Sequence, residues 1–438
     1  MEMLLFVTDK VKIIFKSILL VIVLTLFNML LLVCSFMLPT GRMRQHVADS
    51  YLLIEAENPY LEWDTYYLST RVDFWSEYTE YGMAINGDSE GSPFEQAMYM
   101  RYIDTEGRPR DVSVKDYARD PEAYFEQSEY PRYWNGVVIF YKVLLLFFNI
   151  ADIRMLNMIL QISLLCFIVY LMVKKDMSEY IFLFLVAIMF INPVTMLLSV
   201  KFSSEYIPML LGVIVILLYG ERIDKIKSGW PYYFAVIGSI TSFLCMLSFP
   251  GITLGIPLIV IIWKMGEKEV IKKAITGTFF WTLAYGITWI MKWIICTLFT
   301  DYNLLEDAFE RADFYSAGQS ENAPLAERIM RNIIIYDQAG YKVLLIVAIL
   351  FVVTSICFGY KNNAIRMVET KLYDVICGYL IVLFIPFGIF AALGNGYSYE
   401  HSYMAHRQLS IAVVAGLCIF RILLSRSSLL FFNRRGQK

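Results

Sequence analysis

Acidic residues set among aromatic side chains are the first feature of this sequence that could do chemistry. The stretch ENPYLEWDTYYLSTRVDFWSEYTEY holds an acid-x-acid pair, Glu62 and Asp64, and a third carboxyl group at Asp73. Aromatic rings that exclude water would raise the pKa of such a carboxyl toward the working range of a general base. Because five acid-x-acid pairs occur between residues 39 and 135, a solvated acidic surface is the alternative interpretation.

Four basic residues could hold an anionic group at the membrane surface: Arg132, Lys201, Lys292 and Arg407. Arg407 directly precedes an apolar run, and an arginine at such a boundary can hold a phosphate bidentately. Lys292 lies about 10 Å inside an apolar run, which indicates a functional residue unless its side chain snorkels to the headgroups. We expect the four cations to bind an anionic lipid headgroup together, and the sequence leaves open whether they converge.

The three histidines, His46, His401 and His406, lie outside the apolar runs. His401 and His406 are five residues apart, whereas two metal ligands on one helix face are separated by four. We therefore assign no metal ligands.

The composition indicates a multi-pass membrane protein, because 58% of the 438 residues are hydrophobic and the mean hydropathy is +0.54. We predict an all-α fold with about ten transmembrane helices, or eleven if one further run crosses. The ten apolar runs are 13–38, 156–173, 180–198, 206–219, 232–249, 252–263, 277–299, 343–359, 375–393 and 409–424.

Lysine and arginine in the short connections set the orientation, because they are retained on the cytoplasmic side. They fall in alternate connections, which predicts a cell-membrane protein with both termini in the cytoplasm. The residues are Lys174, Lys175, Arg222, Lys225, Lys227, Lys264, Lys268, Lys272, Lys273, Lys361, Arg366, Lys371, Arg426, Arg434 and Arg435. These connections contain no glycine-rich phosphate-binding loop, which argues against a nucleotide site on the cytoplasmic side.

An eleventh apolar run, residues 136–150, follows Tyr130 and Trp134 and is shorter than the roughly 20 residues that a spanning helix needs. If it crossed, every later basic connection would lie outside. We therefore predict an interfacial helix, with Lys142 snorkelling to the headgroups. By the same reasoning, Phe249-Pro250-Gly251 should separate two antiparallel helices.

The expected organisation has five parts. They are the cytoplasmic end and first span (1–38), an extracytoplasmic loop with the interfacial helix (39–150), a transmembrane bundle (151–299), a second extracytoplasmic loop (300–342) and the C-terminal spans with a cytoplasmic tail (343–438). The first loop is acidic, with nineteen acidic and nine basic residues between positions 39 and 135. All seven cysteines fall in expected spans, so no disulfide is expected in the loops outside.

This layout resembles the GT-C fold of glycosyltransferases that use polyprenyl-phosphate-linked sugars, and Glu62-Trp63-Asp64 is similar to the acidic signature in that fold's first outer loop. The resemblance implies transfer of a sugar from a lipid-linked donor to a cell-envelope glycan acceptor. It implies a carboxylate base at Asp64, Glu62 or Asp73. By position only, it makes Arg132, Lys292, Arg407 and Lys201 the candidates for donor-phosphate binding. No fixed cofactor is implied, although the family sometimes uses a divalent metal such as Mg²⁺ or Mn²⁺. No nucleic-acid partner is expected.

Two other classes of function fit the same layout. A transporter or flippase of a lipid-linked saccharide would show repeated halves, broken helices and charges near the membrane midplane. A non-catalytic envelope-assembly protein would have no outer carboxylate that matters to activity. The concentration of polar residues in one outer loop favours the transferase.

Overall fold

The computed structural model is almost entirely helical and describes residues 2–64, 66–87, 91–104, 110–121, 123, 125–266, 268–307, 323–361 and 372–435. Seven of the described helices are long and apolar enough to cross a membrane, so the chain is a multi-pass helical membrane protein. These helices are α1 (Glu2–Phe36), α8 (Ile150–Lys174), α11 (Ser203–Lys225), α14 (Val270–Phe299), α17 (Ala339–Lys361), α18 (Leu372–Ala392) and α20 (Leu409–Arg435).

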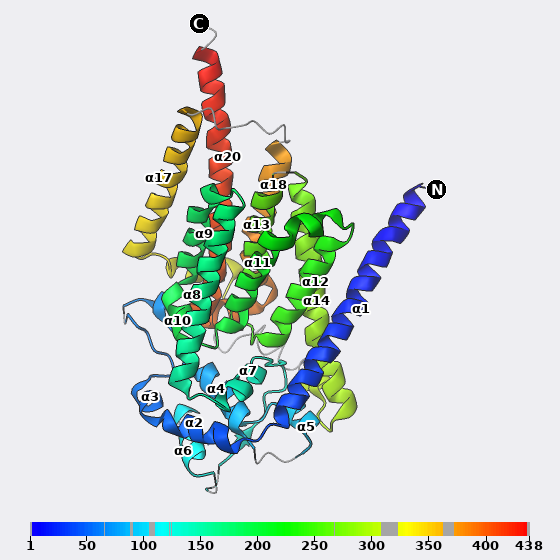
Figure 1. Cartoon of the computed structure of the whole chain (residues 1–438), viewed down its shortest axis with the longest axis vertical. Coiled ribbons are helices and arrows are strands. Elements are labelled where there is room, and N and C mark those ends of the chain that lie inside the picture. The colour runs from blue at the N-terminus through cyan, green and yellow to red at the C-terminus, as the bar shows by residue number, and fades with distance from the viewer. Residues whose placement is uncertain are drawn as a thin grey trace.

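Three shorter apolar helices complete the bundle, and each contacts the long helices (Figure 1). They are α9 (Ser178–Ile191), α12 (Gly229–Leu244) and α13 (Ile252–Met265). Each of the ten apolar runs therefore contains a bundle helix, although the run 180–198 is interrupted at Asn192 and the run 232–249 extends past the end of α12. The predicted break at Phe249-Pro250-Gly251 is confirmed, because residues 245–251 separate α12 from α13.

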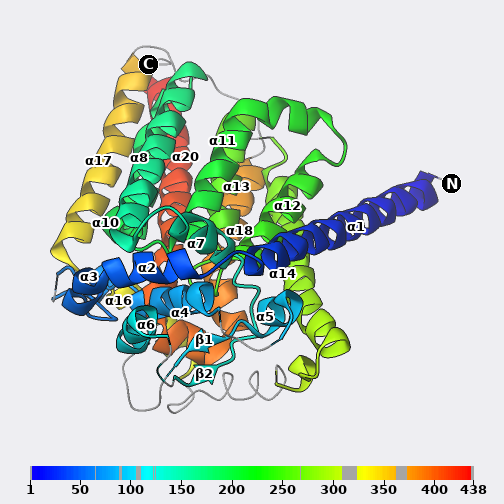
Figure 2. The ribbon, with the colours of Figure 1, turned by 60° about the horizontal axis from the view of Figure 1, so that its bottom comes forward.

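The described residues between positions 39 and 135 form a lobe at one end of the bundle (Figures 1 and 2). Its elements are α2 (Gly41–Asp49), α3 (Tyr51–Ala56), η1 (Leu68–Thr70), α4 (Phe74–Ile85), α5 (Pro93–Tyr99), β1 (Tyr102–Ile103), α6 (Arg110–Arg119) and β2 (Gln127–Ser128). The two strands pair antiparallel. In Figure 1, the first residues of α1 and the last residues of α20 lie away from the lobe.

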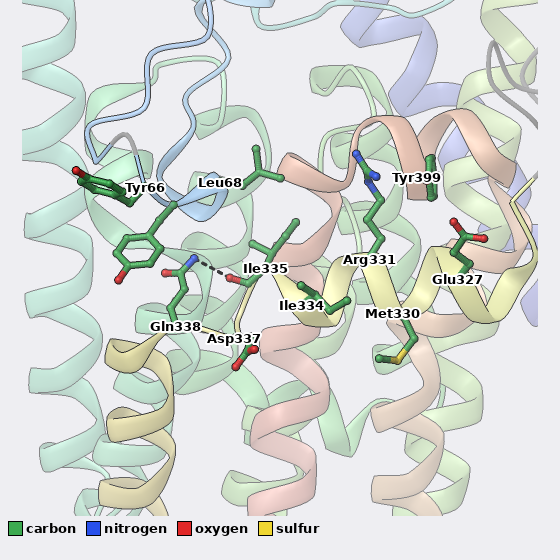
Figure 3. Close-up of a pocket in the computed structure, with 11 residues that line it drawn as sticks. Tyr66, Leu68, Glu327, Met330, Arg331, Ile334, Ile335, Asp337, Gln338 and Tyr399 are labelled. Atoms are coloured by element: carbon green, nitrogen blue, oxygen red, sulfur yellow. Dashed lines mark hydrogen bonds between the residues drawn. The ribbon is translucent and has the colours of Figure 1, made fainter.

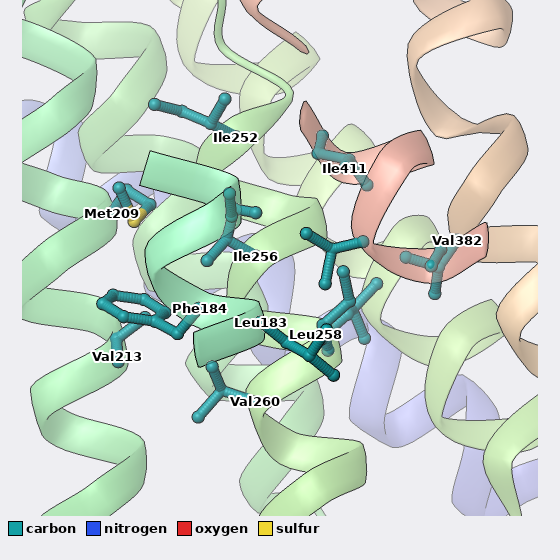
Figure 4. Close-up of a cluster of buried hydrophobic side chains, with 14 of the residues drawn as sticks. Leu183, Phe184, Met209, Val213, Ile252, Ile256, Leu258, Val260, Val382 and Ile411 are labelled. Atoms are coloured by element: carbon teal, nitrogen blue, oxygen red, sulfur yellow. The ribbon is translucent and has the colours of Figure 1, made fainter. Parts of the chain in front are cut away.

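Two apolar cores hold these parts together. The bundle core joins α9, α11, α13, α18 and α20 and includes Phe184, Val213 and Ile411 (Figure 4). The lobe core extends into the bundle through Leu32 of α1 and Ile295 of α14, both of which pack with lobe residues such as Tyr78. The lobe thus packs directly against the ends of α1 and α14 through a shared apolar core.

Short elements connect the helices at the lobe end of the bundle. They are α7 (Val138–Leu145), α10 (Pro193–Leu198), α16 (Leu325–Ile334), the π-helical turn η2 (Gly396–Glu400), α19 (Ser402–Ala405) and η3 (His406–Gln408). Asn192 separates α9 from α10 with a left-handed backbone, φ 67°, and its side chain accepts a hydrogen bond from the Thr195 amide.

The run 136–150 does not cross the bundle, because it holds only the eight-residue helix α7. The expectation that Lys142 snorkels is wrong. Its ammonium group is buried and donates to the Ala84 carbonyl over 2.8 Å at the C-terminal end of α4, and burial lowers its pKa to about 8. Trp134 is likewise buried, and its indole N–H donates to the Thr288 carbonyl over 2.7 Å. Lys142 and Trp134 are therefore part of the protein core, whereas Phe140, Val143 and Phe147 of the same run remain exposed.

Two sequence predictions fall partly on residues outside this description. Arg366 and Lys371 of the basic connection before α18 lie there, as do residues 308–322 of the expected second loop. The described end of that loop contains the short helix α16, followed directly by α17.

Candidate functional site

The lobe segment 62–71 forms a tight loop closed by its own side chains. Glu62 and Arg71 are paired by an isolated β-bridge, and the Arg71 guanidinium binds the Glu62 carboxylate at 2.8–2.9 Å. The Thr70 hydroxyl donates to the Asp64 carbonyl over 2.8 Å. The Glu62 carboxylate is therefore engaged in an ion pair at the base of this loop.

Asp64 lies inside the same loop and is half-buried. Its Oδ1 accepts a hydrogen bond from the Tyr66 amide over 3.2 Å, a short-range contact that fixes the turn. Among the described residues, no cation pairs with this carboxylate within 4 Å. Of the three carboxylates singled out from the sequence, Asp64 is the one that is neither ion-paired nor fully buried.

Asp73 has a structural position at the start of α4. It is 1% exposed, and its Oδ1 accepts from the Ser76 amide over 3.1 Å, so it is the N-cap of the helix. Glu77 and Glu80 follow on the same helix and are also fully buried. α4 thus presents three acidic side chains to the end of the bundle.

Glu77 is fully satisfied by hydrogen bonds. Its Oε1 accepts from Arg154 of α8 over 3.0 and 3.2 Å, and its Oε2 accepts from the Val200 and Lys201 amides over 3.0 and 3.3 Å. A buried carboxylate with a paired guanidinium and several N–H donors is stable in its ionised form. Glu77 therefore fastens the lobe to α8 and to the turn before α11.

Glu80 has a different environment. Its nearest charged partner is the Lys201 ammonium group at 3.6 Å, and neither of its carboxylate oxygens has a hydrogen bond of good geometry among the described residues. Burial, only partly opposed by Lys201, raises the pKa of Glu80 to about 8. Burial alone would lower the pKa of Lys201, but Glu80, Glu205 and Asp73 outweigh it and hold the pKa above its ordinary value.

Arg407 is completely buried and supports the lobe loop from below. Its guanidinium donates to the Ser69 carbonyl over 3.3 Å and to the Arg71 carbonyl over 2.9 Å, and it also binds the Tyr403 carbonyl. Its planar group lies over the Phe202 ring at 4.8 Å. Arg407 is therefore committed to backbone carbonyls of the loop that contains Asp64.

The four predicted phosphate ligands do not form one set. Lys201 and Arg407 are both buried, and both interact electrostatically with the buried carboxylate of Asp73. Lys292 is buried elsewhere, donating to the Ala97 carbonyl over 2.8 Å beside the Trp134 ring, so it does not snorkel. Arg132 is ion-paired with Asp307 at 3.2 Å. Three of the four side chains are thus buried in protein contacts.

An open pocket of about 550 Å³ lies beside the loop (Figure 3). One wall is the lobe segment Tyr66–Leu68, and the other is α16 with the residues that follow it. The lining residues are Tyr66, Tyr67, Leu68, Glu327, Met330, Arg331, Ile334, Ile335, Asp337, Gln338 and Tyr399. Because Gln338 donates to the Ser69 hydroxyl over 3.0 Å, the two walls are joined next to the carbonyl that Arg407 holds.

Arg331 is the basic residue of this pocket, and the sequence reasoning missed it. Its Nε donates to the Ser402 hydroxyl over 3.2 Å, and its guanidinium lies 4.2 Å from the Tyr399 ring centre (Figure 3). The residue is exposed, and its terminal nitrogens have no hydrogen-bond partner among the described residues. Arginines at three-residue spacing in LAERIMRNII, beside apolar residues, were the available signal of an amphipathic helix.

The three histidines have separate environments. His46 donates to the Leu145 carbonyl over 2.7 Å, and His406 donates to the Ser402 carbonyl over 2.9 Å. His401 lies near Asp73, and burial lowers its pKa. Within the described part of the chain, no three His, Cys, Asp or Glu side chains are grouped as metal ligands.

Comparison with known proteins gives no relative. No family model matches the sequence, and no curated protein or solved structure matches it significantly.

Proposed function

We propose that this protein is a membrane glycosyltransferase that moves a sugar from a polyprenyl-phosphate-linked donor to a cell-envelope acceptor at the lobe side of the membrane. The observation that carries the proposal is the pocket between the Asp64 loop and α16. It places a carboxylate-bearing loop and an available guanidinium at the level where the spanning helices end.

The different environments of the three carboxylates support Asp64 as the general base. Glu62 is neutralised by Arg71, and Asp73 caps α4 inside the protein. Asp64 precedes the three pocket residues Tyr66–Leu68 and keeps an unpaired carboxylate. A base must reach the hydroxyl proton it removes, so position takes precedence over pKa in this choice.

Arg331 is the proposed ligand of the donor phosphate. A guanidinium binds phosphate oxygens bidentately, and the Ser402 hydroxyl and Tyr399 ring hold this one in place. The exposed Tyr66 and Tyr67 rings suit stacking against a sugar ring. The buried cations Lys201 and Arg407 do not contact the substrate in this proposal. They hold the loop and the adjacent helix ends in position.

The same proposal includes the finer topology. α9, α12 and α13 cross together with the seven long helices to give ten spans, both termini lie in the cytoplasm, and the lobe lies outside. The basic connections at the end of the bundle opposite to the lobe support this orientation. It explains the donor class, because a sugar donor outside the cell must arrive in the lipid phase.

The experiment is a transfer assay in proteoliposomes with polyprenyl-phosphate-linked sugars and cell-envelope glycan acceptors. The proposal expects one released polyprenyl phosphate for each sugar transferred, and loss of transfer in Arg331→Gln. The matched control is Arg328→Gln on the same helix, because Arg328 points to the Phe390 carbonyl instead of the pocket. Movement of intact lipid-linked saccharide between leaflets without transfer would instead support the transporter function. No activity with any donor would support the non-catalytic envelope-assembly function.

A further inference from the structure

Helix α16 has a face that the protein leaves uncovered. Leu325, Met330, Ile333 and Ile334 are 39%, 50%, 41% and 59% exposed. The other side of the helix is anchored, because the Asn332 side chain is completely buried and donates to the Arg328 and Ser398 carbonyls over 2.8 and 2.6 Å. α16 is therefore a fixed amphipathic helix with an apolar outward face.

The neighbouring helix α17 indicates what covers this face. α17 begins at Ala339, and only 17% of its apolar window is buried, so most of its surface faces lipid. Val343 and Ile346, on its first turns, are 59% and 57% exposed. The apolar face of α16 ends at Ile334, so the chain passes within a few residues from this face to a lipid-facing span.

Length and charge fit a position in the plane of the membrane surface. At 1.5 Å per residue the ten residues of α16 extend only about 15 Å, half of a hydrocarbon core. Its charged residues Glu327 and Arg331 line the pocket on the lobe side, and an exposed ion pair between Asp337 and Lys342 marks the corner before α17. A polar face toward the pocket and an apolar face toward acyl chains are what an interfacial helix requires.

We infer that α16 lies in the lipid leaflet on the lobe side, with Met330, Ile333 and Ile334 among the acyl chains. α16 thus joins residues 136–150, which stay the predicted interfacial segment, at the lobe-side membrane surface. The pocket then opens at the lipid surface, because Met330 and Ile334 belong to both its wall and the lipid-facing stripe. An amphiphile can enter from the leaflet without passing through water. The membrane position of α16 stands without the transferase, and only the nature of the amphiphile rests on the proposed function.

The test is photo-crosslinking of the full-length protein in nanodiscs of phosphatidylethanolamine and phosphatidylglycerol. p-Benzoylphenylalanine replaces Met330 or Ile334 one at a time, with Ile333 as an independent third position. Ile346 of α17 is the lipid-facing control. The solvent control is the exposed Asp120, which directly follows α6, a helix at the end of the lobe away from the bundle (Figure 1). Only variants that melt at the wild-type temperature are scored.

Lipid adducts on the α16 peptide, with a yield within about threefold of position 346, are the expected result for a helix at the acyl boundary. Yields as low as at position 120 would overturn the inference, because α16 would then face water. Crosslinks to another part of the chain in place of lipid would overturn it too. Neither result depends on sugar transfer, so the inference and the proposed function fail separately.

Discussion

Glu80 makes the stability of this protein depend on pH in a way that one substitution removes. The side chain is completely buried, its nearest cation is 3.6 Å away, and its pKa is raised from 4.5 to about 8, chiefly by burial. In the unfolded chain this carboxyl is ionised above about pH 4.5. The folded state therefore holds one proton more than the unfolded state between about pH 4.5 and pH 8.

This additional proton determines whether the stability rises or falls with pH. A group that binds a proton more tightly when folded stabilises the fold at low pH and loses this stabilisation as the pH rises. The expected slope is about 1.4 kcal/mol per pH unit inside the window. From pH 5.5 to pH 7.5 this amounts to a loss of about 2–3 kcal/mol in the free energy of unfolding, since titration of the folded state begins to level the curve near the upper end.

The variant Glu80→Gln keeps the shape of the side chain and cannot titrate. Its amide can bond to the Tyr141 hydroxyl, which lies beside Glu80. Wild type and variant are compared by thermal melting in nanodiscs from about pH 5.5 to pH 8, where the stabilisation of wild type should decline toward the upper end. The wild-type melting temperature should fall by roughly a few degrees more than that of the variant. Parallel curves would refute the argument, because Glu80 would then have an ordinary pKa or a protonation state unchanged by folding.

Two other buried cations give distinct predictions. Lys292→Met removes the donor to the Ala97 carbonyl and should lower the free energy of unfolding by about 1–3 kcal/mol, as measured by melting. Sugar transfer per folded molecule in the proteoliposome assay should not change. A transfer defect without destabilisation would show instead that Lys292 contacts substrate. Arg407→Gln releases the Ser69 and Arg71 carbonyls, so transfer should fall by about tenfold or more through a displaced loop. Arg407→Lys should restore little, because a single ammonium nitrogen cannot hold these two carbonyls together with the Tyr403 carbonyl, which a second guanidinium nitrogen binds. Equal activity of Arg407→Lys and wild type would contradict this role.

The sequence was sufficient for the long apolar helices and insufficient for the short helices and for the contacts between elements. Apolar length located all ten bundle helices, and the Pro250-Gly251 step located the break between α12 and α13, because both signals are local. The roles of Lys142 and Lys292 were not predictable in this way. Each has an apolar neighbourhood in sequence, but the fold brings the carbonyls of Ala84 and Ala97 to their ammonium groups. A snorkelling lysine and a lysine that caps a distant backbone carbonyl have the same local sequence.

The candidate site was predictable in part. Tyr66–Leu68, shortly after Glu62 and Asp64, line a pocket, although neither carboxylate is among its lining residues. The choice between these carboxylates depends on Arg71, which pairs with Glu62 through a β-bridge. Arg331 was missed because α16 is too short to stand out in hydropathy, although its amphipathic pattern was readable.

The most direct test of the account compares Asp64→Asn with Asp73→Asn in single-turnover sugar transfer from a polyprenyl-phosphate donor, with the melting temperature of each variant measured in parallel. The account predicts that Asp64→Asn lowers the transfer rate by about 10²-fold or more and leaves the melting temperature unchanged, since a general base contributes on that scale. Asp73→Asn should lower the melting temperature, because it weakens the N-cap of α4, and should leave transfer per folded molecule within about tenfold of wild type. The reverse pattern, with the rate lost at Asp73 and retained at Asp64, would contradict the central claim that the Asp64 loop carries the chemistry.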